Sequence, residues 1–388
     1  MNLTFKHTKL ACYSGYITQA VVNNFTPLLF VVFAEGLGLN LAQIASLITV
    51  NFAIQMCVDM FGARYAEQIG YRNVLVISQL TAAVGMIALG TLPFIIEPYA
   101  GIIISIVFYA IGSGLTEVMV SPVIEAIPET GKGRNMSFLH SFYCWGHVYT
   151  VIITTLYFNF FGVENWRYLS YFWAVLPLIT AVAFAKVPIN TFGDNSGKRI
   201  GFRGLFKTGI FWVFVLMMWC TGASELAMAQ WSSMFAEISL NVSKNTGDIL
   251  GPCMFAVLMG TARIVFGKVS GKVDTRLCLA ISAVLCVASY LLATIPDIAL
   301  LNLTGCALCG FSVGAMWPGV LSLAAKKFPQ AGTTIFGLLA LSGDVGCFSG
   351  PQVVALFSGE SNLKAGLLAA VFFPVLMIFL VMFLRKRK

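Results

Sequence analysis

The sequence predicts an all-α membrane protein with twelve transmembrane helices in two similar halves of six helices each. Hydrophobic residues make up 58% of the 388 residues and charged residues only 10%, whereas soluble domains carry about 25% charged residues. The apolar residues gather in runs long enough to cross a bilayer, which takes about 20 residues. The basic residues lie almost entirely in every second connection between these runs. Soluble domains are therefore excluded as the main architecture.

The predicted spans follow one another with short connections. Backbone polar groups in lipid must be satisfied within the segment, so runs of this length are predicted to be helices. The first span follows Lys6 and Lys9 and is too long for a cleaved signal, so we expect it to stay in the protein. The spans are predicted at about residues 10–34, 42–63, 73–95, 99–127, 136–161, 167–186, 208–236, 248–268, 276–295, 298–325, 333–357 and 364–384.

The positive charge predicts the orientation in the membrane. Of the 24 Lys and Arg residues, 21 fall at the termini, at span ends or in connections that would share one side, and only Arg167, Lys244 and Lys364 fall on the other. Such an asymmetry is the positive-inside pattern. We therefore expect an integral, multi-pass protein of a cell membrane or bacterial inner membrane, with both termini cytoplasmic. The net charge of +8 then reflects topology, and no nucleic-acid partner is expected.

The two halves are separated by a polar and basic stretch. Residues 1–186 form the predicted N-terminal six-helix half, residues 187–207 a cytoplasmic linker, and residues 208–388 the C-terminal half. Short matches relate the halves, because each places a span on the span six later. Phe33-Ala34-Glu35 recurs as Phe235-Ala236-Glu237, and the spacing of Gly114 and Pro122 recurs in Gly310 and Pro318.

Ionisable side chains inside the spans are costly to bury and therefore mark candidate functional residues. Glu117, Glu225 and Asp344 are the proton-coupling candidates, because a buried carboxylate can exchange a proton near neutral pH. Asp59 and Arg263 occupy equivalent repeat positions and, with Glu67, are predicted to gate the cytoplasmic side through ion pairs. No Lys or Arg is predicted at mid-membrane depth, so we expect a neutral or cationic solute.

Polar side chains near these carboxylates predict a solute site. Ser121 lies one turn after Glu117 on the same helical face. The repeat offset of 202 maps Glu225 onto Asn23, which is followed by Asn24. His140 offers a hydrogen bond, and Trp317 a ring that can stack on a sugar. The predicted solute-binding set is therefore Asn23, Asn24, Ser121, His140, Glu225 and Trp317, although each side chain could instead serve a helix contact, and the gating set a static anchor.

Enzymatic features are lacking in the sequence. The ten cysteines lie in or beside apolar stretches and predict no disulfide framework. No His, Cys and carboxylate cluster has the spacing of a zinc site, and no glycine-rich phosphate loop is present. We therefore expect no metal, no cofactor, no enzymatic activity and no ATP-driven transport.

The six-plus-six pattern with a basic central stretch resembles the major facilitator superfamily, and particularly its fucose permease branch of proton symporters. The loop after the second span resembles the superfamily signature only at Gly70 and Arg72, because Ala63, Glu67 and Gln68 replace the expected Gly, Asp and Arg. The branch is resembled at Asn23-Asn24, Thr116-Glu117 with Ser121-Pro122, His140-Ser-Phe142, Gly222-Ala-Ser-Glu225 and Met316-Trp317-Pro318. The Asp that follows the Asn pair in that branch is missing here, where Phe25-Thr26-Pro27 follows.

The resemblance implies a secondary active transporter that works by alternating access, as a monomer in the lipid bilayer. The expected activity is proton-coupled symport of a sugar or a similar neutral polar solute, with the solute and protons as partners. A proton-coupled exporter of drugs or organic cations is the first alternative, because carboxylates in a cavity rich in Phe and Met also suit a cation. A transporter-like nutrient sensor is the second.

Overall fold

The computed structural model describes residues 3–127, 132–190, 202–269, 272–328, 332–359 and 362–386. Within these helices the side chains of a few residues, Glu67 among them, lie outside the described part. The chain divides into two compact units, unit 1 at Met1–Gly193 and unit 2 at Asp194–Lys388. Their boundary falls inside the predicted linker 187–207, of which residues 191–201 lie outside the described residues.

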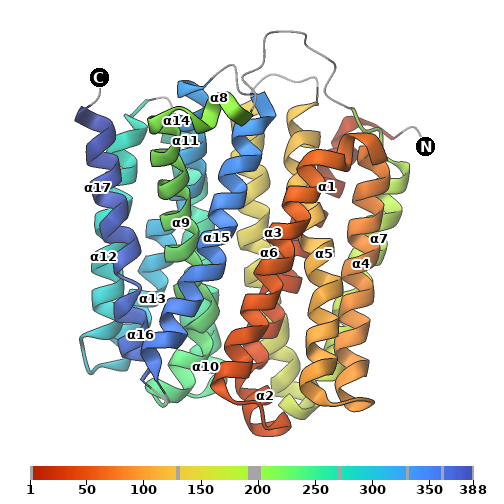
Figure 1. Ribbon diagram of the computed structural model, residues 1–388. Helices are drawn as coiled ribbons and strands as arrows, with labels where there is room; N and C mark the ends of the chain where they lie inside the picture. The colour runs from red at the N-terminus through yellow and green to blue at the C-terminus, as the bar shows by residue number, and fades with distance from the viewer. Residues whose placement is uncertain are drawn as a thin grey trace. The chain divides into compact units, whose positions relative to one another are not determined.

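Unit 1 consists of helices that run between its two ends (Figure 1, red to yellow-green). A 3₁₀ turn at Thr26–Leu29, which contains Pro27, joins the first two helices into one span. The Thr8 hydroxyl donates to the Pro188 carbonyl over 2.6 Å, so the unit begins and ends at the same side. The helices are α1 (Phe5–Phe25), α2 (Phe30–Leu37), α3 (Leu41–Ile69), α4 (Tyr71–Thr91), α5 (Pro98–Glu125), α6 (Lys132–Phe161) and α7 (Trp166–Lys186).

Unit 2 repeats this plan with more interruptions. A π-helical turn at Phe235–Ser239 extends the long helix α9, and a second one at Ile249–Cys253 precedes α11. The helices are α8 (Phe202–Phe206), α9 (Gly209–Met234), α10 (Lys244–Asp248), α11 (Met254–Val269), α12 (Thr275–Thr294), α13 (Ala299–Gly314), α14 (Met316–Lys327), α15 (Gly332–Ser358), α16 (Leu363–Ala369) and α17 (Phe372–Lys386).

Two of these interruptions have a proline as their cause. Proline lacks the N–H that would bond the carbonyl four residues earlier, and its ring crowds that carbonyl. Helix α13 ends at Gly314, four residues before Pro318, and α16 ends beside Ala370, four residues before Pro374. The same residue type is tolerated inside α5, α7 and α15, where Pro122, Pro177 and Pro351 lie within continuous helices.

The predicted membrane architecture is confirmed. Ten helical segments in the described part are long and apolar enough to cross a membrane. Helices α6 and α15, of 30 and 27 residues, occupy the two remaining predicted spans. Large apolar side chains such as Phe160 and Leu356 are 79% and 77% exposed, as expected for a surface covered by lipid.

The two units use one scheme of helix packing. In unit 1, α1 packs against α5 and α6, α3 against α5, and α4 against α5 and α7. In unit 2, α9 packs against α13 and α15, α11 against α13, and α12 against α13 and α17. Each pair of helices in contact in unit 2 corresponds to a pair in contact in unit 1, with each helix six spans later in the chain. The units therefore have the same internal topology.

Glycines bring α9 and α15 into backbone contact. A Cβ atom on Gly346 would lie 2.7 Å from the Ala223 nitrogen, and one on Gly350 would lie 2.7 Å from the Ala223 Cα. Gly222 lies in the same way against the Gly343 carbonyl. Small residues allow such close packing between helices in lipid, where no hydrophobic driving force pulls helices together.

A cavity of about 480 Å³ lies between α3, α4 and α5 in unit 1 and is lined by apolar side chains such as Ile54, Phe61 and Ile77. Cys57 also lines it and has an exposed thiol, whereas eight of the ten cysteines are buried. This lining offers few hydrogen-bonding groups.

An ion pair lies on the loop between α12 and α13, at one end of unit 2. The Lys364 ammonium donates to Asp297 Oδ1 over 2.9 Å and to the Pro296 carbonyl over 3.2 Å. The hydrogen bond and the charge of Lys364 hold the pKa of Asp297 below its usual value. Because Asp297 is fully exposed, this pair orients the loop between α12 and α13 and adds little to stability.

Candidate functional site

Three side-chain hydrogen bonds join α1 to α5 in unit 1. The Tyr16 and Ser121 hydroxyls lie 3.1 Å apart, the Gln19 amide donates to Glu117 Oε2 over 2.6 Å, and the Ser113 hydroxyl donates to Asn23 Oδ1 over 3.3 Å. The residue numbers rise along α1 as they fall along α5, as expected for two neighbouring antiparallel helices. We call these six side chains the polar ladder.

Asn23 is the best-connected member of the polar ladder. Its Oδ1 atom accepts from Asn51 Nδ2 at 3.4 Å and from Gln55 Nε2 at 3.2 Å, in addition to Ser113. Both amides come from α3, and Asn51, Gln55 and Ser113 are buried. The carbonyl oxygen of Asn23 is therefore committed to holding α1, α3 and α5 together.

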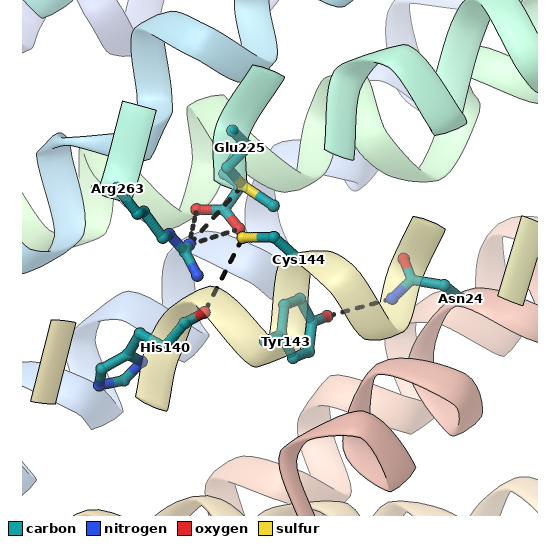
Figure 2. Close-up of polar contacts among 7 residues, drawn as sticks. Asn24, His140, Tyr143, Cys144, Glu225 and Arg263 are labelled. Atoms are coloured by element: carbon teal, nitrogen blue, oxygen red, sulfur yellow. Dashed lines mark hydrogen bonds and ion pairs between the residues drawn. The ribbon is translucent and has the colours of Figure 1, made fainter. Parts of the chain in front are cut away.

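Asn24 and His140 lie at the contact between α1 and α6. The Asn24 amide donates to its own helix at the Ala20 carbonyl over 2.8 Å and to the Tyr143 hydroxyl over 3.3 Å (Figure 2). The His140 ring meets the Tyr16 ring edge-on, with centroids 5.2 Å apart. The structure thus places Asn24, Ser121 and Glu117 on the two helices of the polar ladder, and His140 on the neighbouring α6.

In unit 2 the polar centre is a buried ion pair. Arg263 Nη2 lies 3.4 Å from both Glu225 carboxylate oxygens (Figure 2). It also lies 3.6 Å from Met259 Sδ. Glu225 and Arg263 are each 5% exposed. Glu225 sits near the midpoint of the span Gly209–Ser239. The guanidinium therefore reaches the middle of its unit.

This pair corrects part of the sequence-based interpretation. Arg263 was expected near the cytoplasmic end, and its absence from mid-membrane depth was the argument against an anionic solute. The long Arg side chain carries its charge far from its own Cα, and α11 lies where it can reach α9. A buried cation is available in unit 2 after all, so that argument no longer holds.

The two units place related contacts at corresponding positions. Asn23 corresponds to Glu225 at an offset of 202 residues, and an offset of 204 maps Gln55 onto Met259 and Asp59 onto Arg263. In unit 1 an amide of α3 bonds Asn23 of α1, and in unit 2 the guanidinium of α11 pairs with Glu225 of α9. One unit therefore builds this contact from neutral groups and the other from charged groups.

The remaining candidates lie on other helices. Asp344 on α15 is 3% exposed, and the preceding Gly343 lies against the Trp317 ring of α14. This contact shows that Trp317 packs on α15, with part of its surface still exposed. Asp59 is buried on α3, one turn beyond Gln55. The side chain of Glu67 lies outside the described residues, so its predicted gating role stays a prediction.

Three side chains of this arrangement were not singled out from the sequence: Tyr16, Gln19 and Tyr143. Gln19 was detectable, because it lies four residues before Asn23 and so shares its helical face. The tyrosines carried no comparable signal, since aromatic residues in membrane helices are common at packing contacts. Among the described residues, no group of three His, Cys, Asp or Glu side chains is placed to hold a metal ion.

Polar side chains held inside apolar, membrane-spanning helices, in two units of the same topology, define a class of protein: membrane transporters of small solutes. The family model described as Major Facilitator Superfamily matches residues 12–351. The chain belongs to this superfamily. It is accordingly a transporter and not an enzyme.

Relatives and solved structures agree with this placement. Over 265 residues the chain is 26% identical to the membrane protein MosC of Rhizobium meliloti, a match that covers 68% of this chain and 63% of that relative. The chain thus spans less than two thirds of the relative's length.

Two crystal structures share the fold. A bacterial homolog of the human lysosomal transporter Spinster, in an inward-facing and occupied conformation, has a TM-score of 0.76 at 12% identity and covers 100% of this chain and 98% of its own. The E. coli fucose:proton symporter FucP has a TM-score of 0.70 at 15% identity, with 97% and 98% covered. At these identities the likeness concerns the fold.

Proposed function

We propose that the chain is a secondary active transporter that carries a sugar or a similar hydroxylated solute together with a proton, by alternating access of its two units. The observation that carries the proposal is the carboxylate of Glu117 in the polar ladder. It lies on a membrane-spanning helix and accepts a hydrogen bond from Gln19. Burying a carboxylate at such depth costs free energy, so a carboxylate that is kept there indicates a function.

Glu117 combines the two properties that coupling requires. Its Oε2 atom is held by Gln19 at 2.6 Å, and the side chain keeps part of its surface exposed, so a proton or a solute can reach it. Ser121 lies one turn further along α5, with its hydroxyl 3.1 Å from that of Tyr16. A solute that bonds Glu117 therefore meets hydroxyl groups as its next partners.

The other predicted residues receive roles from their positions. Asn24 and His140 would bond the solute from α1 and α6, while Asn23 would hold the scaffold. Glu225 and Asp344 would be further proton sites in unit 2. Asp59 and Glu67 would gate the cytoplasmic side, whereas the predicted gating role of Arg263 is not proposed again, because its guanidinium pairs with Glu225 in the middle of unit 2. The fold shared with a fucose:proton symporter supports this reading. Both termini would be cytoplasmic, as the distribution of Lys and Arg favours.

Export of organic cations is the second candidate, and an aromatic cluster favours it. The Tyr13 and Phe142 rings stack with centroids 4.2 Å apart, and Phe138 meets both rings edge-on. This cluster lies on α1 and α6, the helices that also carry Tyr16 and His140. Aromatic faces attract cations, and Glu117 would supply the opposite charge.

The test is transport by the purified protein in liposomes with an inward proton gradient. Labelled hexoses, fucose, nucleosides and a cationic dye are offered to the wild type and to Glu117→Gln. We expect gradient-driven accumulation of a sugar by the wild type. Glu117→Gln should reduce this accumulation to the level of protein-free liposomes, because an amide binds no proton, while exchange of internal for external sugar persists.

Glu35→Gln is the matched control, because Glu35 is an exposed carboxylate of the same unit. It should transport like the wild type. Movement of the dye alone, outward against the proton flux, would refute the sugar symporter and establish the exporter. Sugar accumulation that survives in Glu117→Gln would remove Glu117 from the coupling mechanism.

A further inference from the structure

The ion pair between Glu225 and Arg263 is built in a way that does not maximise stability. Tight charge-assisted hydrogen bonds measure about 2.7–2.9 Å, and Arg typically donates to a carboxylate from two nitrogens. Here one nitrogen, Nη2, lies 3.4 Å from both oxygens. Removing two charges from water costs more than such a pair returns, and apolar replacements are often as stable. The pair is therefore better explained by function than by folding.

The corresponding contact of unit 1 shows that the architecture does not need these charges. Asn23 occupies the position of Glu225 there, and the amides of Asn51 and Gln55 satisfy it. Among the described contacts, Asn23 is thus held to α3 by neutral amides, although Asp59 is buried at the position that corresponds to Arg263. Because Asn23 carries no charge, an ion pair at this position is a feature of unit 2 and not of the shared scaffold.

We propose that Arg263 is a solute-binding residue and that it recognises a single carboxylate on the transported solute. Glu225 holds the guanidinium while the site is empty. When a proton binds Glu225, the guanidinium turns to the solute carboxylate. The inference rests on the proposed proton-coupled symport and adds an acidic group to the hydroxylated solute, such as the carboxylate of a sugar acid.

Charge balance decides how many protons accompany the solute. The empty site holds one negative carboxylate and one positive guanidinium, and its net charge is zero. The loaded site holds a neutral carboxylic acid, the guanidinium and one solute carboxylate, and its net charge is again zero. Loading thus leaves the charge of the pair unchanged, with one proton at Glu225 for each monovalent anion, while the proton at Glu117 carries one net positive charge in each transport cycle. A phosphate dianion would leave an uncompensated negative charge, which is costly in this environment.

Other titratable groups stand on the helices packed against α9 and α11. Within the described part of unit 2 these are Asp344 and Cys347 on α15, Tyr290 and Cys286 on α12, Cys306 and Cys309 on α13, Lys326 and Lys327 at the end of α14, and Lys244 with Asp248 on α10, among others. Lys244 and Asp248 pair with each other at 3.2 Å, and the Tyr290 hydroxyl donates to the Ser224 carbonyl over 2.8 Å. Asp344 is the carboxylate that could replace Glu225 as the proton site, so it must be tested beside it.

The experiment measures uptake of radiolabelled D-glucuronate and D-glucose by the full chain in liposomes. A pH gradient, alkaline inside, and a membrane potential set by potassium and valinomycin are imposed separately. We expect the pH gradient to drive glucuronate accumulation, and a potential that is negative inside to speed glucuronate and glucose uptake alike, because the proton at Glu225 cancels the charge of the solute carboxylate. A glucuronate rate that does not respond to the potential would overturn the proposal.

Variants assign the roles. Arg263→Gln should weaken glucuronate binding about 10- to 100-fold, the loss expected when a charged hydrogen-bonding partner is removed. Because that variant leaves Glu225 buried without its cation, the double variant Glu225→Gln with Arg263→Gln removes both charges and should fold and show the same loss. Lys268→Gln, an exposed cation on the same helix, is the control and should bind like the wild type.

Glu225→Gln should bind glucuronate equally well across the pH range and exchange it, but should not accumulate it. If Asp344→Asn has this phenotype and Glu225→Gln does not, the proposal is wrong. Proton-driven uptake of glucose with no uptake of glucuronate would overturn the inference and leave the proposed function standing. Uptake of neither compound would refute the inference and also count against sugar symport.

Discussion

At the scale of single residues, the two neighbouring asparagines of α1 have different surroundings. Asn23 accepts three hydrogen bonds from buried donors of α3 and α5, whereas Asn24 bonds its own helix and a hydroxyl of α6. Both were predicted to bind the solute, because they are adjacent and have the same side chain. Their neighbours in space separate a scaffold residue from a candidate for solute contact.

Asn23→Ala should therefore lower the free energy of unfolding more than Asn24→Ala does. It leaves the buried amides of Asn51 and Gln55 without this acceptor, whereas the Ser113 hydroxyl keeps Gln55 Oε1 at 3.0 Å. An unsatisfied buried donor costs about 1–3 kcal/mol. We expect a difference of at least about 1 kcal/mol between the two variants, measured by thermal unfolding of the purified proteins in detergent. Equal stability, with transport lost only in Asn23→Ala, would contradict the scaffold role and return Asn23 to the solute site.

The pairing of Glu225 with Arg263 could not be predicted from the sequence. Glu225 and Arg263 were both recognised as unusual, because each is a charge inside an apolar span. Their pairing was not predicted, since 38 positions separate them and no helical periodicity links α9 to α11. Which helices touch, and how far an Arg side chain extends between them, depends on tertiary packing. Charged residues in spans can thus be found from the sequence, whereas their partners require the fold.

At the scale of elements, helix positions followed closely from apolar run length, and the interruptions followed less well. Pro318 and Pro374 each stand four residues after a break, while Pro122 and Pro351 cause none. A freed carbonyl can be satisfied by neighbouring helices, and that depends on surroundings that the sequence does not display. The π-helical turn at Phe235–Ser239 had no sequence signal, whereas the turn at Ile249–Cys253 contains Pro252.

The contact between α9 and α15 gives an element-scale prediction. Gly346→Val should prevent the folding of unit 2, because its Cβ would lie 2.7 Å from a backbone nitrogen of α9. Gly337→Ala on the same helix meets nothing within 4 Å and should be neutral or slightly stabilising, as Ala favours helix by about 1 kcal/mol over Gly. The measurement is the fraction of each variant that elutes as a single species in size-exclusion chromatography. A well-folded Gly346→Val would disprove the close approach.

At the scale of the whole molecule, composition was sufficient for the class and the repeat for the architecture. Helices stand at each predicted span, and the packing scheme of unit 1 returns in unit 2. The solute could not be predicted in this way, because its identity depends on a few side chains, and composition does not determine how these side chains are oriented. The family membership leaves that question open as well, since one fold hosts many functions.

Orientation is the whole-molecule property that the charges predict. Green fluorescent protein fused after Lys388 should fluoresce in bacterial cells, and alkaline phosphatase fused there should be inactive, because the basic connections are expected on the cytoplasmic side. Fusions in the connection between α15 and α16, directly before Lys364, should give the opposite result, active phosphatase and no fluorescence. Active phosphatase at the C-terminus would reverse the predicted topology.

The exposed thiol of Cys57 has a practical consequence. Eight other cysteines are buried and Cys278 is partly covered, so a lipid-soluble maleimide should react first in the apolar cavity of unit 1. The natural chain thus carries its own attachment point for a spectroscopic label. A second cysteine introduced on an exposed position of unit 2 would turn the transporter into a two-colour distance reporter, with which its motions could be followed one molecule at a time.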